Sequence, residues 1–467
     1  MQIRKVNISK YRSISWLSIP LKTLEDGSQT VGLIGMNEAG KSSILKAIAS
    51  IDGDVPIVAK DFRDKQKPVQ ITLVYDFEPE EFDAVLTHIT TTKEIEKPEQ
   101  YVVGPAHMCF STTLPGLDKT YLIGLEYAQP VDPAKAINWF TVPSIPQVLR
   151  QKAIFWTAAS NYLIDKPIEL TGFASSPSSI SIPLRNCFLL AGIDNIAARI
   201  ASLEGDSTEI ELLSRELGEK VTEHLSQVWP NHPVEITFLI SGNLVNFHVR
   251  DLGTQGKAKT ADQRSDGFRQ FVSFLLTISA QNKNEELANT ILLLDEPETH
   301  LHPLAQEYLL RELVALTFND RGNAVLFATH SNYLIDKSDL SRNFRVLKHG
   351  DESKLEAFDK KNSSYASVSY EVFSIPSTDY HNELYGVLHE RFQNEDTNDE
   401  TRERIKFFDE ALFHKKHGQK RTYPLRGKPK EATLPTYVRN CIHHPESGQK
   451  FSEEELSNSI QLMRGML

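Results

Sequence analysis

The sequence predicts an α/β protein with a phosphate-binding head and a C-terminal α-helical domain. An apolar strand, Thr30–Ile34, runs into a glycine-rich loop and then into a helix-forming segment, Ser43–Ala49. Two further apolar strands, Ile291–Leu294 and Ala324–Ala328, each end in polar or ionisable residues. After residue 376, apolar residues recur at helical spacing. Strands that alternate with helices indicate an α/β head, and the helical tail indicates a separate domain.

Composition says more about the compartment and the partners of the protein than about its fold. The chain has 467 residues, of which 40% are apolar, and this is sufficient for real cores. The N-terminus does not resemble a signal peptide, no apolar run approaches a membrane span, and the three cysteines lack metal-binding spacing. We therefore expect a cytoplasmic protein without a membrane partner. The net charge of −11 argues against a coat of nucleic acid but allows a local basic site.

Residues 35–42 form a complete G-x-x-x-x-G-K-S phosphate-binding loop. Its glycines let the backbone N–H groups cradle phosphate oxygens at a helix N-terminus. We expect Lys41 to reach the β and γ phosphates of ATP and Ser42 to ligate Mg²⁺. A glycine turn that binds nothing is the alternative, and the flanking strand and helix weigh against it. The predicted nucleotide-binding residues are Asn37, Glu38, Ala39, Gly40, Lys41, Ser42 and Ser43.

Before and after this loop, the first 255 residues contain few other motifs. Gln2–Ile8 and Trp16–Leu21 alternate apolar and polar residues and predict a hairpin or edge sheet. The segment from about 55 to 255 is predicted to be an α/β insertion. Its expected elements are a strand at 69–76, helices at 80–92 and 210–229, and a hairpin of 234–240 with 244–249. The helix at 210–229 is too short for a coiled-coil arm and is expected to pack on the core.

The strand at Ile291–Leu294 ends in two acids that complement the phosphate-binding loop. Asp295 can bind Mg²⁺, and Glu296 can orient and deprotonate the attacking water. Two solvated acids at a strand end are the alternative, and the segment that follows, Pro297–Pro303, argues against it. His330 follows the next strand and is a candidate sensor of the γ-phosphate, although a strand-end histidine alone is more often structural.

A second anion site is predicted upstream, in Arg264–Gln270, where Ser265 and Gly267 form a turn before an apolar helix. An ordinary helix cap is the alternative. Gly267 lies shortly before the acidic strand, and this position favours an anion site over an ordinary helix cap.

These four parts, in this order, resemble the ABC-type ATPase heads of the SMC, RecF and OLD families. The resemblance covers about residues 1–345. It identifies Arg264–Gln270 with the OLD-type signature, Ile291–Glu296 with Walker B, and His330 with the switch histidine. It implies ATP and Mg²⁺ as cofactors. It also implies a homodimer of heads with ATP sandwiched between one protomer's loop and its partner's signature, with a larger ring as a further arrangement.

Two departures from the family pattern limit what the resemblance implies. The glutamine of the Q-loop is not assigned, and Gln70 is only a candidate. No long coiled-coil arm of the SMC kind is predicted, so tethering of DNA over long distances is not expected. The clustered Glu and Asp-x-Asp residues that hold metals in OLD nucleases are not found at strand ends after residue 345.

The C-terminal domain, 376–467, follows a polar, serine-rich segment, 346–375, that is predicted to be a linker. Four helices are expected, at 379–393, 398–414, 434–443 and 452–463. Arg439, Asn440 and His444 match R-N-x-x-x-H, which resembles the active motif of HEPN-domain ribonucleases. Histidine can exchange protons with RNA hydroxyls, and arginine can hold phosphorane charge, without a metal. Positions five apart on a helix diverge by about 140°, so the pair converges only at a helix end or across two chains.

A basic stretch precedes this motif and offers an approach for RNA, with Tyr423 and Tyr437 as candidates for base stacking. A solvated basic loop is the alternative. Its members are Lys415, Lys416, Lys420, Arg421, Arg426, Lys428 and Lys430.

Three functional hypotheses remain open from the sequence. The first is an ATPase of anti-phage defence whose heads control a metal-independent ribonuclease acting on RNA such as tRNA. The second is an ATPase scaffold or sensor whose C-terminal helices dock a separate nuclease, as in the Septu and PARIS systems, and respond to a phage trigger. The third is a RecF-like DNA-repair ATPase, which the overall acidity disfavours.

Overall fold

The computed structural model contains two compact units, residues 1–336 with 340–359 and residues 337–339 with 360–467. We call them the N-terminal and C-terminal units. The structure describes all residues except 22, 54, 92–94, 96–97, 131, 158–161, 165, 204–205, 229–232, 253–257, 261–262, 264–268, 270–271, 274–275, 277–288, 300, 319–321, 359–363, 395–407 and 425–430. Within the described part, none of the helices combines the length and apolarity needed to cross a bilayer.

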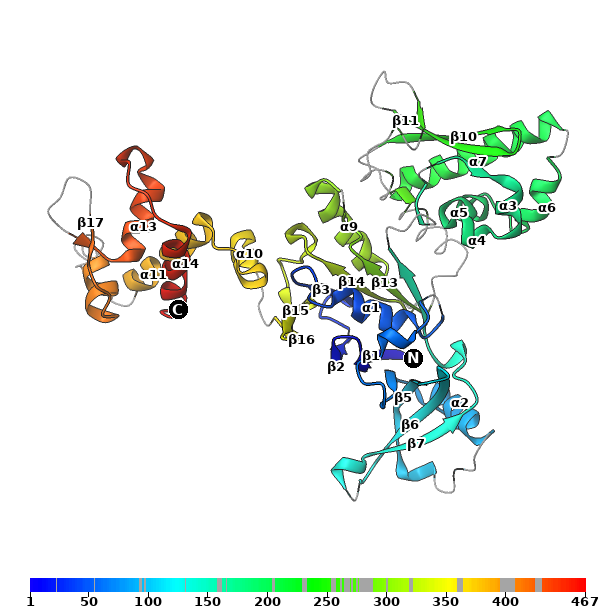
Figure 1. Cartoon of the computed structure of the whole chain (residues 1–467), viewed down its shortest axis with the longest axis horizontal. Coiled ribbons are helices and arrows are strands. Elements are labelled where there is room, and N and C mark those ends of the chain that lie inside the picture. The colour runs from blue at the N-terminus through cyan, green and yellow to red at the C-terminus, as the bar shows by residue number, and fades with distance from the viewer. Residues whose placement is uncertain are drawn as a thin grey trace. The chain divides into compact units, whose positions relative to one another are not determined.

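The central sheet of the N-terminal unit carries the phosphate-binding loop (Figure 1). Its strand order is β16-β15-β3-β14-β13-β8, and only β16 is antiparallel to its neighbour. The strands are β3 (Thr30–Ile34), β8 (Lys152–Trp156), β13 (Thr290–Asp295), β14 (Ala324–Thr329), β15 (Asn343–His349) and β16 (Glu352–Ala357). Parallel strands end at the same edge, so the residues after β3, β13 and β14 are brought together there.

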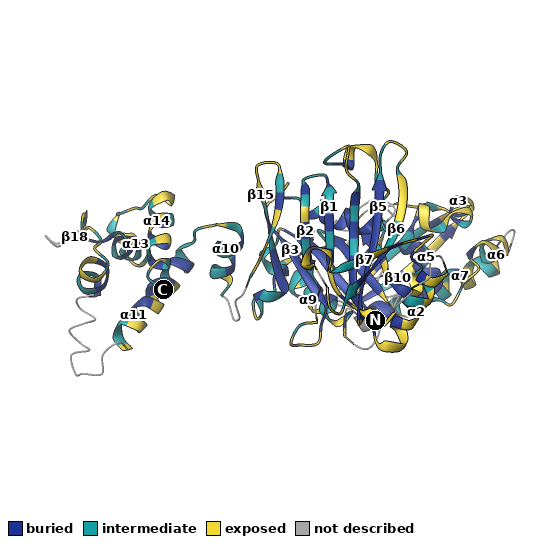
Figure 2. Cartoon of the chain, turned by 90° about the horizontal axis from the view of Figure 1, so that it is seen from below, coloured by how far each residue is buried: buried dark blue, intermediate teal, exposed yellow. Residues whose placement is uncertain are grey.

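The strands β3, β13 and β14 are buried on both faces, which explains their continuous apolar runs. Leu293 faces the core that contains α1 (Lys41–Ala49). Its neighbour Leu292 faces the core that contains α9 (Pro303–Ala315). The strands are accordingly dark in Figure 2, which marks buried residues. The predicted α/β class, with a helical C-terminal region, is confirmed.

A second, antiparallel sheet packs on α1 and extends the N-terminal hairpin. Its order is β2-β1-β4-β5-β6-β7. The strands are β1 (Gln2–Tyr11), β2 (Ile14–Pro20), β4 (Val69–Asp76), β5 (Tyr101–Thr113), β6 (Asp118–Tyr127) and β7 (Ile137–Val142), with α2 (Pro79–Thr90) after β4. The hairpin and the strand predicted at 69–76 are both present.

The segment predicted as an insertion, about 55–255, is divided among three sheets. Strands β4 to β7 complete the antiparallel sheet, and β8 pairs with β13 in the central sheet. Only the residues after β8 build a further lobe. An alternating pattern predicts that a segment is a strand, but it does not say which strand it pairs with, because pairing depends on distant residues.

The further lobe packs helices against a small sheet of β9, β10, β11 and β12. The long helix α7 (Ser207–Val228) buries Leu213, Leu217, Val221 and Leu225 on one face, as the spacing predicts. The hairpin predicted at 234–249 is present. The remaining elements are α3 (Leu170–Ser175), α4 (Pro177–Ile180), α5 (Ile182–Leu190), α6 (Ile196–Ala201), β9 (Ile168–Glu169), β10 (Val234–Ser241), β11 (Leu244–Asp251) and β12 (Lys259–Thr260).

The C-terminal unit is a helical cluster with its own aromatic core. A capping box begins the last helix, because Ser452 and Glu455 exchange hydrogen bonds with each other's backbone N–H. Most of the helix predicted at 398–414 lies outside the described residues, and its end forms a π-helical turn, Asp409–Lys416. The other elements are α10 (Tyr365–Phe373), α11 (Thr378–Asn394), α13 (Leu434–His443), α14 (Glu453–Arg464), β17 (Tyr423–Pro424) and β18 (Glu431–Ala432).

The segment predicted as a linker, 346–375, contains regular structure instead. It holds most of β15, all of β16 and the helix α10. The β15–β16 hairpin extends the central sheet beside β3. Serine and charged residues dominate this segment because β16 is an edge strand with one face exposed, so polarity alone did not distinguish it from a linker.

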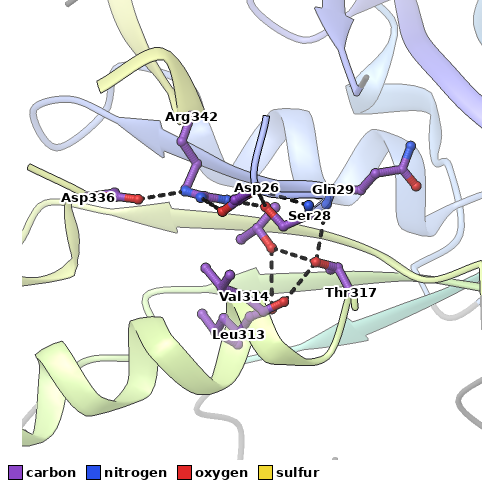
Figure 3. A network of polar contacts seen from close by, with 9 residues as sticks. Asp26, Ser28, Gln29, Leu313, Val314, Thr317, Asp336 and Arg342 are labelled. Carbon is purple, nitrogen blue, oxygen red and sulfur yellow. Dashed lines mark hydrogen bonds and ion pairs between the residues drawn. The ribbon is translucent and has the colours of Figure 1, made fainter. Parts of the chain in front are cut away.

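A buried polar network fixes the start of β3, the strand before the phosphate-binding loop (Figure 3). Arg342 is 3% exposed and donates three hydrogen bonds, which end on Ser28 Oγ (2.6 Å), Asp26 Oδ2 (2.5 Å) and Asp336 Oδ2 (2.9 Å). The backbone N–H of Gln29 donates to Thr317 Oγ1, just after α9, at 3.1 Å. These bonds tie β3 to α9 and to the segment after β14.

A buried ion pair joins the end of α1 to the two sheets. Arg150 donates to both carboxylate oxygens of Asp52 at 2.7 and 3.0 Å, and their side chains are 7% and 9% exposed. We expect Arg150→Ala to destabilise the N-terminal unit by about 3–5 kcal/mol, because it leaves a buried carboxylate unpaired. Urea unfolding would measure this loss. The exposed pair of Arg4 with Asp76 provides the control, and Arg4→Ala should cost about 0–1 kcal/mol.

The same ion pair gives the stability a defined pH dependence. Burial acts to raise the pKa of Asp52, but the hydrogen bonds and charge of Arg150 outweigh it and hold that pKa below its ordinary value. The contribution is therefore fully present above the ordinary aspartate pKa, and it is lost as pH falls through the lowered pKa of the folded state. In Arg150→Ala this acid-side loss should be smaller, and an unchanged acid profile would contradict the assignment.

Candidate nucleotide site

The phosphate-binding loop is held in a shape that only glycine permits at two positions. Gly40, just before α1, has φ of +108°, and a Cβ there would lie 2.2 Å from Ser353 Oγ. A Cβ on Gly35 would lie 2.4 Å from the backbone oxygen of Val346. Ser353 also donates to the backbone oxygen of Ala39 at 2.7 Å. The β15–β16 hairpin therefore supports the loop from behind.

Lys41 points back into the loop that it follows. Its Nζ donates to the backbone oxygens of Gly35 (2.7 Å) and Met36 (3.0 Å), and the residue is 5% exposed. Burial lowers the pKa of Lys41, while the nearby carboxylates of Glu296 and Asp295 act to raise it. Because these bonds go to carbonyl oxygens, the buried ammonium is placed to bind a strong anion such as phosphate.

The acidic strand meets the loop through Asp295, the last residue of β13. Ser42 Oγ donates to Asp295 Oδ1 at 2.8 Å. Burial raises the pKa of Asp295, although the hydrogen bond from Ser42 opposes this shift. A hydroxyl and a carboxylate side by side are the hard oxygen ligands that Mg²⁺ prefers. The donor set therefore fits the predicted metal.

Glu296 and His330 lie beside each other because β13 and β14 are parallel neighbours. His330 Nδ1 is 3.3 Å from Glu296 Oε1, and both side chains are partly exposed. Glu296 has φ of +51°, which is unusual for a residue with a side chain, and its N–H donates to the oxygen of Ala328 at 3.0 Å. Strained backbone of this kind is concentrated at functional sites.

A pocket of about 360 Å³ lies over the loop. It is lined by the predicted residues Asn37, Glu38, Gly40, Lys41, Ser42, Ser43 and Glu296. Ala39, Asp295 and His330 are not among its lining residues. Arg12 and Lys348 also line it, and neither was predicted from the sequence. Neither lies in a motif, since the β1–β2 turn and β15 bring them to the loop only in the folded chain.

Two sets of predicted residues are not among those that the structure describes at this site. Ser265 and Gly267 lie outside the described residues, so the predicted signature remains a prediction. Gln70, the candidate for the Q-loop, lies within β4, where it pairs with Ser9 and Ser111 in the antiparallel sheet. It is not among the residues that line the pocket.

In the C-terminal unit, the side chains of the two predicted ribonuclease residues lie in different surroundings. The guanidinium of Arg439 lies 4.8 Å from the ring centroid of Tyr385 on α11. His444 caps the end of α13; its side chain is 63% exposed and lies 3.2 Å from Glu446 Oε1. His443, four residues after Arg439, shares the helical face of Arg439. The predicted helix end is present, but Arg439 faces α11 while His444 is exposed to solvent.

The fold also buries or pairs some of the residues that were predicted to contact RNA. Tyr423 and Tyr437 stack on each other with centroids 4.9 Å apart, and Tyr437 is buried, so its ring is not open to a base. Arg421 pairs with Asp409 at 3.1 Å and with Glu410 at 2.5 Å. Acids that precede the basic stretch in sequence thus neutralise part of it in space. Three predicted basic residues lie outside the described part: Arg426, Lys428 and Lys430.

Comparisons with known sequences concern the head. Residues 195–336 match the family model "AAA domain, putative AbiEii toxin, Type IV TA system". The chain is similar to the Old nuclease of Escherichia phage P2, with 27% identity over 136 residues, 25% of this chain and 23% of that protein. It is also similar to an uncharacterized protein, MJECL43, of Methanocaldococcus jannaschii, with 27% identity over 123 residues, 25% of this chain and 31% of that protein. The chain thus spans less than a third of these relatives' length.

Solved structures of SMC heads align with most of the chain at low similarity. An SMC head bound to the C-terminal winged-helix domain of ScpA gives a TM-score of 0.45 at 12% identity, covering 77% of this chain and 98% of that one. The head from Pyrococcus furiosus gives 0.43 at 10% identity, covering 76% and 96%. The head from Thermotoga maritima gives 0.37 at 12% identity, covering 77% and 100%.

Proposed function

We propose that this chain is an ABC-type ATPase of the OLD and SMC kind whose nucleotide state controls its C-terminal domain. The observation that carries the proposal is the meeting of three strand ends at one edge of the central sheet, beside the pocket. There Lys41 lies in the loop, Ser42 contacts Asp295, and Glu296 lies beside His330. The AAA family match and the similarity to the Old nuclease support an ATPase.

In this proposal each residue of the site has a task in ATP hydrolysis. The loop N–H groups and Lys41 hold the phosphates, and Arg12 and Lys348 add positive charge at the pocket wall. Ser42 and Asp295 would hold Mg²⁺, which neutralises phosphate charge when bound. Glu296 accepts the proton of the attacking water. His330 keeps the carboxylate of Glu296 in place through their contact.

The heads are proposed to work as a homodimer, and a larger ring is compatible with the same contacts. In this arrangement Ser265 and Gly267 of one protomer close the nucleotide site of its partner. Arg12 and Lys348 line the pocket from outside the loop, and the predicted signature residues lie outside the described part of the chain. ATP binding would then join the heads and hydrolysis would release them.

The C-terminal unit is proposed to be a HEPN-like, metal-independent ribonuclease of a cytoplasmic anti-phage system, with RNA, such as tRNA, as its substrate. Arg439 would hold the scissile phosphate and His444 would transfer a proton. Exposure of His444 at the end of α13 supports this role, because a partner chain or RNA can reach it. The second candidate is a docking scaffold for a separate nuclease, favoured by the partial neutralisation of the basic stretch. A RecF-like role in DNA repair is the third.

Removing the loop lysine tests the ATPase proposal at the binding step. We expect Lys41→Ala to weaken ATP binding roughly 10- to 100-fold, because charge-assisted bonds to phosphate are lost. Titration with a fluorescent ATP analogue would measure the affinity of the full chain. The exposed Lys60 is the control, and Lys60→Ala should bind normally. Equal affinity of Lys41→Ala and the unaltered chain would refute the proposed site.

A further inference from the structure

A buried carboxylate next to the nucleotide pocket has no role in the scheme above. Glu298 follows Glu296 by two residues and is 2% exposed. Its Oε1 accepts a hydrogen bond from Thr329 Oγ1. Its Oε2 has no hydrogen-bond partner among the residues that the structure describes. A buried polar atom without a partner lowers stability, so a protein that keeps one at this place invites a functional explanation.

The partner of Glu298 belongs to the segment that carries the switch histidine. Thr329 is the last residue of β14 and immediately precedes His330. Besides donating to Glu298, Thr329 Oγ1 accepts the backbone N–H of Ser331 at 2.9 Å. The carboxyl, the hydroxyl and this amide form a chain of bonds that fixes the backbone on both sides of His330. His330 in turn contacts Glu296 at 3.3 Å.

The surroundings of Glu298 favour an uncharged role. Lys41 donates to backbone oxygens of the loop, and His330 pairs with Glu296. Burial raises the pKa of Glu298, while the hydrogen bond from Thr329 and the charge of His330 oppose that shift only in part. Glu298 is also absent from the residues that line the pocket. Its task therefore needs a hydrogen-bond acceptor more than a negative charge.

We propose that Glu298 is a positioning residue for ATP hydrolysis, which holds Thr329 and thereby sets His330 against Glu296. This inference rests on the proposed ATPase function. Glu298 does not touch the nucleotide, and its effect reaches the water through Thr329, His330 and Glu296. The role separates the two glutamates of this segment: Glu296 acts as a base, whereas Glu298 acts through its shape and its acceptor oxygen.

The test compares isosteric and truncated variants in the full chain by steady-state ATP hydrolysis. Glu298→Gln keeps an oxygen that can accept from Thr329, and kcat should stay within about threefold of the unaltered chain. Glu298→Ala and Thr329→Val should each lower kcat roughly 10- to 100-fold with KM for ATP changed less than about threefold, since misplacement of a catalytic group affects turnover. Thr329→Ser should restore most of the rate. The double variant should be no slower than the slower single variant.

The outcomes separate the failure of this inference from that of the ATPase proposal. No hydrolysis by the unaltered chain, alone or with its partners, would remove both. Normal hydrolysis with Glu298→Gln as slow as Glu298→Ala would overturn the positioning role, because the charge would then matter. Additive losses in the double variant would also overturn it. Thermal unfolding of each variant identifies a simple folding defect, and Thr329→Val, which replaces the hydroxyl with a methyl group of similar size, then decides the question.

Discussion

Replacing Glu296 with glutamine is expected to slow ATP hydrolysis by about 10²- to 10⁴-fold while leaving ATP binding intact. The amide cannot accept the proton of the attacking water, although it has the size of the carboxylate. The left-handed backbone of Glu296 and its contact with His330 place this side chain at the pocket, and it lines the cavity above the loop. Hydrolysis is measured by phosphate release, and binding by titration with a fluorescent nucleotide.

Another carboxylate of the same pocket provides the matched control for this prediction. Glu38 also lines the cavity, but it lies in the loop and has no contact with His330 among the described bonds. Glu38→Gln should hydrolyse ATP at a rate within a few-fold of normal. A nearly normal rate for Glu296→Gln would assign the base to another group.

The same variant tests the proposed pairing of heads. If hydrolysis separates the protomers, Glu296→Gln should accumulate as a dimer with ATP and return to monomer when ATP is removed. Light scattering after size-exclusion chromatography would measure the mass in each state. A monomer in saturating ATP would remove the sandwich arrangement and leave the ATPase proposal to the binding and turnover results.

Replacing His444 with alanine is expected to lower RNA cleavage by about 10²- to 10⁴-fold and to leave ATP hydrolysis unchanged. His444 is exposed at the end of α13 and belongs to the C-terminal unit, whereas the residues that line the nucleotide pocket belong to the N-terminal unit. Cleavage of total cellular RNA by the purified chain, with and without ATP and in the presence of a chelator, would measure the effect. Cleavage that persists in chelator is expected, because the proposed chemistry needs no metal.

The neighbouring residue His443 provides a closely matched control for the prediction on His444. His443 shares the helical face of Arg439, whereas His444 does not. Comparing RNA cleavage by His443→Ala and His444→Ala therefore shows which of the two adjacent histidines takes part. Arg439→Ala should also abolish cleavage. Arg439→Lys keeps the charge but loses the planar fork, and it guards against a folding defect from loss of the contact with Tyr385. Full cleavage by both Arg439→Ala and His444→Ala would contradict the HEPN-like assignment. No cleavage by the unaltered chain in any nucleotide state would favour the docking scaffold.

The nucleotide loop and the strand ends could be predicted from sequence because their signals are local. The loop needs two glycines, a lysine and a serine at fixed spacing, and the structure confirms that Gly35 and Gly40 have no room for a Cβ. The contact of Ser42 with Asp295 follows from two strands that end at the same edge of the sheet. Helices such as α7 and α13 were predicted because the apolar spacing that defines a helix lies within one segment.

Other features depend on which distant segments of the chain pack together, and only the tertiary structure shows them. Sequence alone did not show that β4 to β7 complete the N-terminal sheet, or that the β15–β16 hairpin supports the loop through Ser353. It also gave no sign of Arg12 and Lys348 at the pocket, or of the bond between Glu298 and Thr329. The sequence determined the chemistry that each segment can perform, since that follows from residue type and local spacing. Pairing of strands and burial of side chains determined which groups meet, because those depend on contacts between residues far apart in the chain.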